Sequence, residues 1–298
     1  MTEHDDHLIR VAALGGRVRA LAVDATQVVR KLVEVHGTAP AATAALGRVA
    51  TGALLLGALL KQEQHLVTLR VRGDGPAGTV LASANGRGEV RGLISNPRPD
   101  IEQVRNGKLN VAGAVGRHGH LTVVRDMGMR HPYNSTVELV SGEIGQDLAY
   151  YFTRSEQTPS ALGVGVFVDR NGGVDAAGGY LIQVLGGLRD DEVEQMEAEI
   201  SALPHPTTML RAGETPERIL ARVFGDAFQV LHRGPVRFHC PCDRDRAERA
   251  LRLLGGHALE ELRHDEAERG HSDVVCEFCG TRYRFTLADI DRLIADAA

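Results

Sequence analysis

All four cysteines of the chain lie near its C-terminal end, in two close pairs. Cys240 and Cys242 stand on either side of Pro241, and Cys276 and Cys279 are separated by two residues. Each pair can supply two thiolates from one tight turn, and the segment between them can bring the second turn round to complete a tetrahedron. The spacing therefore predicts that these four residues bind one Zn²⁺ ion. The first pair is tighter than usual, and Pro241 fixes one backbone dihedral of its turn.

Two other interpretations of the cysteines are unpaired buried thiols and a structural disulfide framework. A disulfide framework suits a small secreted chain, whereas the start of this chain, MTEHDDHLIR, is acidic and is not expected to be a signal peptide. A nearby histidine could also replace one thiolate, but with four cysteines present we expect the histidines to be solvated. The histidines in question are His239, His257, His264 and His271.

A zinc ion held by four thiolates is expected to be structural, because a catalytic zinc keeps an open position for water. The sulfurs are nevertheless in the thiolate form that oxidants attack. The segment from about 236 to 298 is too small to bury much core, and modules of this size often depend on a metal. Structural zinc is worth about 10–16 kcal/mol, against about 5–15 kcal/mol for the net stability of a whole domain.

Oxidation of these cysteines is expected to unfold the module. It removes the ligands, and disulfides that join neighbours, Cys240–Cys242 and Cys276–Cys279, would close only tiny loops. Such loops restrict the unfolded chain little and do not tie the two halves of the module together. The sequence therefore predicts a redox switch.

The residues around the cysteines resemble a known protein family. FHCPCDRDRAERALRLLG at 238–255 and VVCEFCGTRYRFTLADIDRL at 274–293 are similar to the zinc module of the redox-regulated 33 kDa chaperonins, which are bacterial heat-shock holdases. Asp243 and Asp245 stand where that family usually has Ser and Glu, and the spacing between the pairs is slightly long, but neither departure removes a ligand. The resemblance covers essentially the whole chain. Further similar segments are YYFTRSEQ at 150–157 and DAAGGYLIQVL at 175–185.

The resemblance implies a chaperone without enzyme activity that is inactive while reduced and is activated by oxidation together with heat. In the family, activation releases zinc, unfolds the module and a preceding linker, and favours homodimers that bind unfolded client proteins without ATP. ATP-dependent foldase chaperones act downstream. The resemblance also makes Cys240, Cys242, Cys276 and Cys279 redox centres as well as zinc ligands.

Composition argues against nucleic-acid and membrane partners. The net charge is −5, aromatic residues make up 4%, and tryptophan is absent, so the chain lacks both a cationic excess and a base-stacking surface. The longest nearly apolar run, residues 49–60, is well below the roughly 20 residues that span a bilayer. We expect a cytoplasmic protein, where cysteines stay reduced until an oxidant arrives.

The elements that position the cysteines follow a long α+β region. Alternating apolar residues predict mostly antiparallel strands; the helices predicted there run from Pro40, with Thr38 as cap, to about 60, and from about 144 to 156. The segment from about 18 to 35 stays unresolved between strand and helix. The predicted strands are 67–71, 79–84, 89–95, 109–115, 121–125, 136–141, 163–169 and 179–185.

A composition change at Gly186-Gly187 marks a boundary. Residues 190–203 and 216–224 each show one apolar stripe, and such helices keep their fold by burying that stripe. The predicted organisation is a core domain at 1–187, an amphipathic helical linker at 188–235 and a zinc-binding redox-switch domain at 236–298.

Other functions are weighed against the redox-switched holdase. A zinc-ribbon module for nucleic acid or translation would use the metal only as a clamp, and the acidic balance disfavours it. A thiol oxidoreductase using Cys276 and Cys279 lacks the expected βαβ context. Glycine clusters such as Gly113–Gly116 are not followed by the residues of a phosphate loop, so no nucleotide is expected. Ser155-Glu156 and His118, His120 and His131 show no catalytic spacing and are expected to be structural or on the surface.

Overall fold

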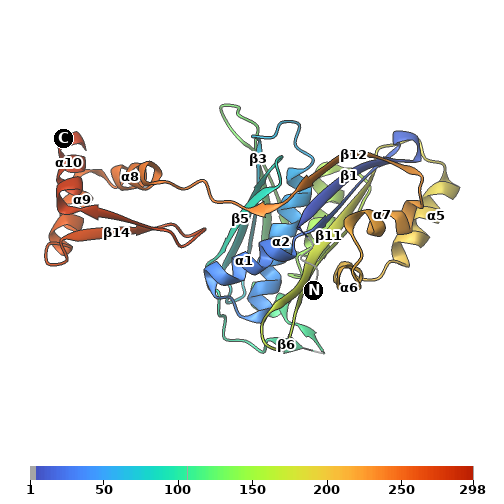
Figure 1. Ribbon diagram of the computed structural model, residues 1–298, viewed down its shortest axis with the longest axis horizontal. Coiled ribbons are helices and arrows are strands. Elements are labelled where there is room, and N and C mark those ends of the chain that lie inside the picture. Colours follow the sequence, from blue (N-terminus) through green and yellow to red (C-terminus); the bar gives the residue numbers. More distant parts are fainter. Residues whose placement is uncertain (1–4, 106, 298) are drawn as a thin grey trace. The chain divides into compact units, whose positions relative to one another are not determined.

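The computed structural model describes residues 5–105 and 107–297, and the chain divides into two compact units, Met1–His239 and Cys240–Ala298 (Figure 1). Residues 188–235, predicted as a linker, lie within the first unit. Each unit has its own buried apolar core.

The first unit contains two large sheets, which are antiparallel except for one short strand, and a small two-stranded sheet. In the five-stranded sheet the order is β10 (Ser160–Val168), β11 (Val174–Val184), β2 (Val18–Asp24), β1 (His7–Ala13) and β12 (Phe228–Pro235). In the six-stranded sheet the order is β13 (Arg237–Phe238), β5 (Glu89–Ile94), β4 (Thr79–Asn85), β3 (Leu66–Gly73), β8 (Gly119–Asp126) and β9 (Tyr133–Glu138), with β13 parallel to β5. The predicted α+β class is confirmed.

A buried helix, α2 (Pro40–Gly57), packs against strands of both sheets, beside α1 (Thr26–His36) (Figure 1). Small residues allow this close packing. A Cβ on Gly47 would lie 2.6 Å from Val166 Cγ2, so a larger residue would not fit there. Proline at the first turn needs no hydrogen-bond partner for its nitrogen. None of the helices in the described part of the chain combines the length and apolar character required to cross a membrane.

Strand residues alternate between two cores because successive side chains point to opposite faces. On β2, Leu21 and Val23 join the core around α2, whereas Ala20 and Ala22 face the other way. The second face is covered by three helices of the region predicted as a linker: α5 (Asp190–Ser201), α6 (Pro206–Arg211) and α7 (Pro216–Phe224). The five-stranded sheet is thus buried on both faces.

A buried carboxylate fixes the loop before α4 (Gly145–Tyr151). Asp147 is fully buried, and its two oxygens accept hydrogen bonds from the backbone N–H groups of residues 140, 141, 142 and 144 and from the hydroxyl of Ser141. The helix continues as a π-helical turn, Phe152–Glu156. The Glu156 carboxylate accepts a hydrogen bond from the Tyr151 hydroxyl and forms an ion pair with Arg125. These contacts give Glu156 a structural role.

Several local predictions differ from the structure. The strand predicted at 109–115 is instead β7 (Lys108–Leu109), which pairs with β6 (Val104–Arg105), and α3 (Val111–Val115). The side chain of Asn110 caps α3 by accepting from the N–H of Gly113. Thr38 does not cap α2, because the cap position is Ala39 and the Thr38 hydroxyl bonds that of Thr43.

The region predicted as a helical linker, residues 188–235, ends in a strand and not in a helix. After α7 the chain forms β12, which pairs antiparallel with β1, with a register shift between Arg10 and Val11. Most of β12 is exposed and lacks the apolar alternation that would have indicated a strand.

Near the other end of the chain, a short 3₁₀ turn, η1 (Leu14–Gly16), joins β1 to β2.

The second unit is a hairpin packed with three helices. The hairpin consists of β14 (His271–Val275) and β15 (Arg282–Thr286), and the helices are α8 (Arg244–Arg252), α9 (Gly255–Asp265) and α10 (Leu287–Ala297). Its buried core is small, and consists of Ala247, Leu251, Leu259, Phe285, Ile290 and Leu293. A core of this size supplies little of the stability that a separate module needs.

Candidate metal centre

The second cysteine pair lies in the tight turn that joins β14 to β15. The Cys276 N–H donates to the carbonyl of Thr281 (2.9 Å), and the Gly280 N–H donates back to the carbonyl of Cys276 (2.8 Å). Gly280 has φ +70°, a conformation that glycine adopts without steric cost. The turn thereby brings Cys276 and Cys279 to the same side, as a pair of metal ligands requires.

The first pair lies immediately before α8. Asp243 caps this helix by accepting a hydrogen bond from the N–H of Arg246 (2.6 Å). Asp243 is one of the two departures from the resembled family, and an aspartate is among the preferred residues at this position. The cap fixes where α8 begins, so Cys240 and Cys242 lie on the segment that leads directly into it.

The four sulfurs form one cluster, with all of them within 4.8 Å of one another. Cys242 Sγ lies 3.2 Å from Cys279 Sγ, and Cys240 Sγ lies 3.7 Å from Cys276 Sγ. A tetrahedral zinc ion with Zn–S bonds of about 2.3 Å requires sulfurs roughly 3.8 Å apart. The donor set therefore fits one Zn²⁺ ion. The nearby histidines contribute no ligand atom to this cluster, which consists of the four cysteines.

Without a metal, the sulfurs of the cluster hold their protons unequally. Burial, together with contacts to the other three sulfurs, raises the pKa of Cys242 to about 12. Burial also raises the pKa of Cys276. Burial acts in the same direction on Cys279, but hydrogen bonds from Thr281 and from the neighbouring thiols outweigh it and lower the pKa of Cys279 to about 7. Four thiolates this close need a cation among them, which is the role of a bound metal.

Two hydroxyl groups contact the sulfur cluster, and the sequence patterns did not single out either residue. The Tyr283 hydroxyl donates to Cys242 Sγ over 3.1 Å, and Thr281 Oγ1 lies 3.2 Å from Cys279 Sγ. The hydrogen bond to sulfur raises the pKa of the Tyr283 phenol. The sequence signal that could have found these two residues is their position. They lie two and four residues after Cys279, beside and on strand β15.

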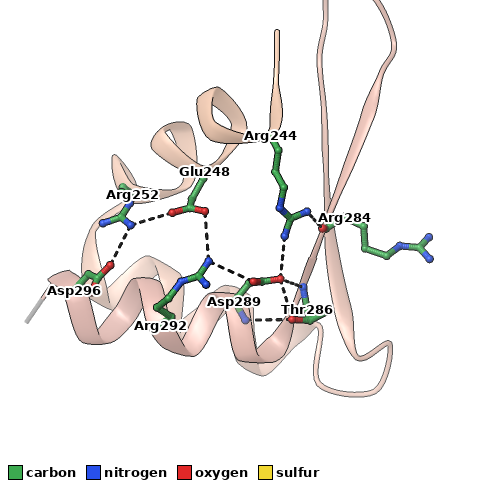
Figure 2. Close-up of polar contacts among 8 residues, drawn as sticks. All are labelled: Arg244, Glu248, Arg252, Arg284, Thr286, Asp289, Arg292 and Asp296. Carbon is green, nitrogen blue, oxygen red and sulfur yellow. Dashed lines mark hydrogen bonds and ion pairs between the residues drawn. The ribbon is translucent and has the colours of Figure 1, made fainter.

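A chain of ion pairs joins α8 to α10 (Figure 2). Arg244, two residues after Cys242, bonds Asp289 and the carbonyl of Arg284, and its guanidinium lies 4.3 Å from the ring centroid of Phe285. The chain continues along the two helices through Arg292, Glu248, Arg252 and Asp296, with N–O distances of 2.9–3.4 Å. The arginine side chains are 44–55% exposed, and exposed pairs contribute only about 0–1 kcal/mol each.

The sequence is similar to that of one known protein family and of individual relatives. A family model described as Hsp33 protein matches residues 6–286. A 33 kDa chaperonin of Geobacter sulfurreducens is 45% identical over 289 residues, covering 97% of this chain and 94% of that protein. A 33 kDa chaperonin of Bacillus subtilis is 41% identical over 288 residues, covering 97% and 98%.

The fold is similar to that of a solved structure. The crystal structure of a 33 kDa chaperonin, a heat shock protein 33 homolog, from Thermotoga maritima matches with a TM-score of 0.90 and 36% sequence identity. The match covers 98% of this chain and 99% of the other. The likeness therefore extends over both compact units and includes the four-cysteine module.

Proposed function

The chain belongs to the Hsp33 family of chaperonins, and from that membership we propose that it is a redox-regulated holdase. In this proposal the reduced protein is inactive, and oxidation of its cysteines lets it bind unfolding or oxidatively damaged proteins and prevent their aggregation. It acts in the cytoplasm, is not an enzyme, and passes its clients to ATP-dependent foldase chaperones. The observation that carries the proposal is the four-sulfur cluster in a module with a very small core.

Cys240, Cys242, Cys276 and Cys279 hold one Zn²⁺ ion in the reduced protein. When bound, the ion keeps the four sulfurs as thiolates and contributes about 10–16 kcal/mol to the folding of its module. The exposed ion pairs between α8 and α10 contribute about 0–1 kcal/mol each, so they cannot replace it. The cluster therefore decides whether residues 240–297 stay folded.

Oxidation removes that stabilisation. Two disulfides, Cys240–Cys242 and Cys276–Cys279, use up all four ligands, and each closes a loop of only a few residues. Loops this short add little stability. They also leave the segment before α8 unconnected to the β14–β15 turn, so the two parts of the module are free to separate.

Loss of the module is proposed to loosen the preceding segment, to which it is joined through β12 and β13. Helices α5 to α7 cover one face of the five-stranded sheet with the apolar side chains of Met196, Met209, Ile219, Leu220 and Phe224. Beneath them lie Ile9, Val11, Ala20, Ala22 and Ile182. Uncovering both sets creates a contiguous apolar surface of the kind that binds unfolded chains.

A homodimer is the expected active assembly. Strand β12 is at the edge of its sheet, and Val230 and Leu231 are half-exposed there (50% and 52%). An exposed edge strand is a template for pairing with another chain. This feature supports pairing between two copies of the chain.

The experiment that tests the switch compares reduced, zinc-loaded protein with protein treated with hydrogen peroxide and then freed of it by catalase. Light scattering follows the aggregation of a heat-unfolding client, and a chromogenic chelator follows zinc release. We expect suppression of aggregation only after oxidation, in step with the release of about one zinc per chain. Equal suppression by both forms would leave the metal as a simple clamp and would contradict the proposal.

A variant in which all four cysteines are serine tests the same proposal without an oxidant. It lacks the ligands, so we expect residues 240–297 to be unfolded and the protein to suppress aggregation in the presence or absence of peroxide. Amide hydrogen exchange measures the state of the module. A variant that keeps the module folded and does not bind the client would refute the switch.

A further inference from the structure

Each cysteine pair has one sulfur in contact with a side-chain hydroxyl. Tyr283 reaches Cys242 of the first pair, although it lies 41 residues away along the chain, and Thr281 reaches Cys279 of the second pair. Both hydroxyls come from the segment that leaves the β14–β15 turn. Tyr283 thus links the second half of the module to a sulfur of the first half.

The Tyr283 hydroxyl is held in place by the hairpin. Tyr283 lies on β15 opposite Val274 of β14, and both side chains pack against the module core that contains Phe285. The ring is therefore anchored at its apolar body, while its hydroxyl reaches the sulfur. A donor fixed in this way needs no further ordering when the sulfur becomes charged.

A hydrogen bond donated to a thiolate withdraws charge from the sulfur and makes it a poorer nucleophile. We propose that the Tyr283 hydroxyl acts as a positioning residue that holds the Cys242 sulfur in the cluster and slows its reaction with peroxides. This role rests on the proposed redox switch. The Cys279 thiol donates to Thr281 Oγ1 over 3.2 Å, and once this sulfur is a thiolate the Thr281 hydroxyl becomes the donor and has the corresponding role. The two hydroxyls thus set how easily one sulfur of each pair is oxidised.

The reaction that Tyr283 restrains has two steps. The Cys242 thiolate attacks one oxygen of hydrogen peroxide, the O–O bond breaks, and hydroxide leaves, so that the sulfur becomes a sulfenic acid by loss of two electrons to the peroxide. A second thiolate, that of Cys240, then attacks the sulfenic sulfur, the S–O bond breaks, and a disulfide and a second hydroxide form. The Tyr283 hydroxyl acts on the first step, in which the Cys242 thiolate is the nucleophile.

The test uses the full-length, zinc-loaded protein and the variant Tyr283→Phe, which removes the hydroxyl and keeps the ring. Sulfenic acid formed by limited peroxide is trapped with dimedone, and mass spectrometry quantifies each cysteine separately. We expect trapping at Cys242 to rise roughly tenfold, the scale on which groups that support a metal ligand act, with little change at Cys276. Thr281→Val should raise trapping at Cys279 and leave Cys242 unchanged.

Tyr133→Phe, on an exposed tyrosine of β9 in the first unit, is the matched control and should change nothing. A uniform rise at all four cysteines in Tyr283→Phe would mean that the ring merely loosens the module, and unchanged trapping would mean that the hydroxyl has no effect. Either result overturns the proposal. The readout does not depend on chaperone activity, so a failure of the holdase function would appear separately, as wild-type protein that is oxidised and still does not bind clients.

Discussion

The four sulfurs share one cluster, but their local contacts give them different affinities for protons. Burial and the other sulfurs raise the pKa of Cys242, and burial raises that of Cys276, whereas hydrogen bonds lower the pKa of Cys279. A raised pKa keeps a proton on the free sulfur at neutral pH. Metal binding must displace that proton, so the affinity for the metal depends on pH.

We expect the apparent affinity for Zn²⁺ to increase as the solution becomes more alkaline. With pKa values above the ordinary range, Cys242 and Cys276 are both protonated near pH 7 in the metal-free protein, and each must lose its proton on binding. At least two protons are therefore displaced, which corresponds to an increase of at least about 100-fold per pH unit.

The measurement is competition with a chromogenic chelator between pH 6 and pH 8, corrected for the protonation of the chelator itself. The variant with four serines is the blank and should not compete at any pH. An affinity that stays constant across this range would show that Cys242 and Cys276 are already thiolates without the metal, and the expectation of displaced protons would be wrong.

At the scale of elements, α6 fits against β10 because the strand has a glycine beneath it. A Cβ on Gly165 would lie 2.2 Å from His205 Cε1 and 2.9 Å from Thr207 Cγ2. His205 and Thr207 begin α6, and the His205 ring caps the helix by accepting from the Thr207 N–H. The space left by Gly165 therefore determines how closely the start of α6 approaches the sheet.

We expect Gly165→Ala to loosen α6 while the metal content stays unchanged. Overpacking of this kind costs about 1–3 kcal/mol, and here the displaced atoms belong to side chains of the helix rather than to the sheet. Hydrogen exchange in residues 206–211 should become at least about fivefold faster, the factor that corresponds to about 1 kcal/mol. If α5 to α7 cover the client surface, the reduced variant should also suppress client aggregation partially.

Gly145→Ala is the matched control for this substitution. Its Cβ would meet Val164 Cγ2 at 3.5 Å, an ordinary contact, so exchange in α6 should stay as in the parent protein. Faster exchange in α6 of Gly165→Ala without any binding of the client would argue that these helices do not cover the client surface.

For the whole molecule, the two compact units rely on different sources of stability. The first buries a large core between its sheets around α2 and a second one beneath α5 to α7. The second unit buries six apolar residues and has exposed ion pairs on its surface. Only the second is therefore expected to depend on a metal.

We expect removal of the metal to affect the two units unequally. A chelator combined with peroxide should abolish hydrogen-exchange protection in residues 240–297 and, through the proposed switch, reduce it in α5 to α7. Protection in α2 and in the central strands should remain. Reduction and re-addition of zinc should restore the original pattern. A module that keeps its protection without metal would show that its small core suffices.

The sequence by itself determined the candidate metal site, because its four cysteines come in two pairs that are close along the chain. The spacing within each pair fixes the local geometry, and it predicted the cluster of Cys240, Cys242, Cys276 and Cys279 that the structure brings together. Strand β3, in which Val67, Leu69 and Val71 alternate with polar residues, was predictable because its signal is also local. The alternation of apolar and polar residues along a strand is a local property of the sequence.

Only the tertiary structure decided the features that depend on distant partners. Strand β12 forms because β1 offers it an edge more than 200 residues earlier in the sequence. The Tyr283 hydroxyl reaches Cys242 only after β15 has paired with β14. Spacing along the chain specifies which residues can share a turn, whereas contacts across the fold are decided by packing and by the pairing of backbone groups.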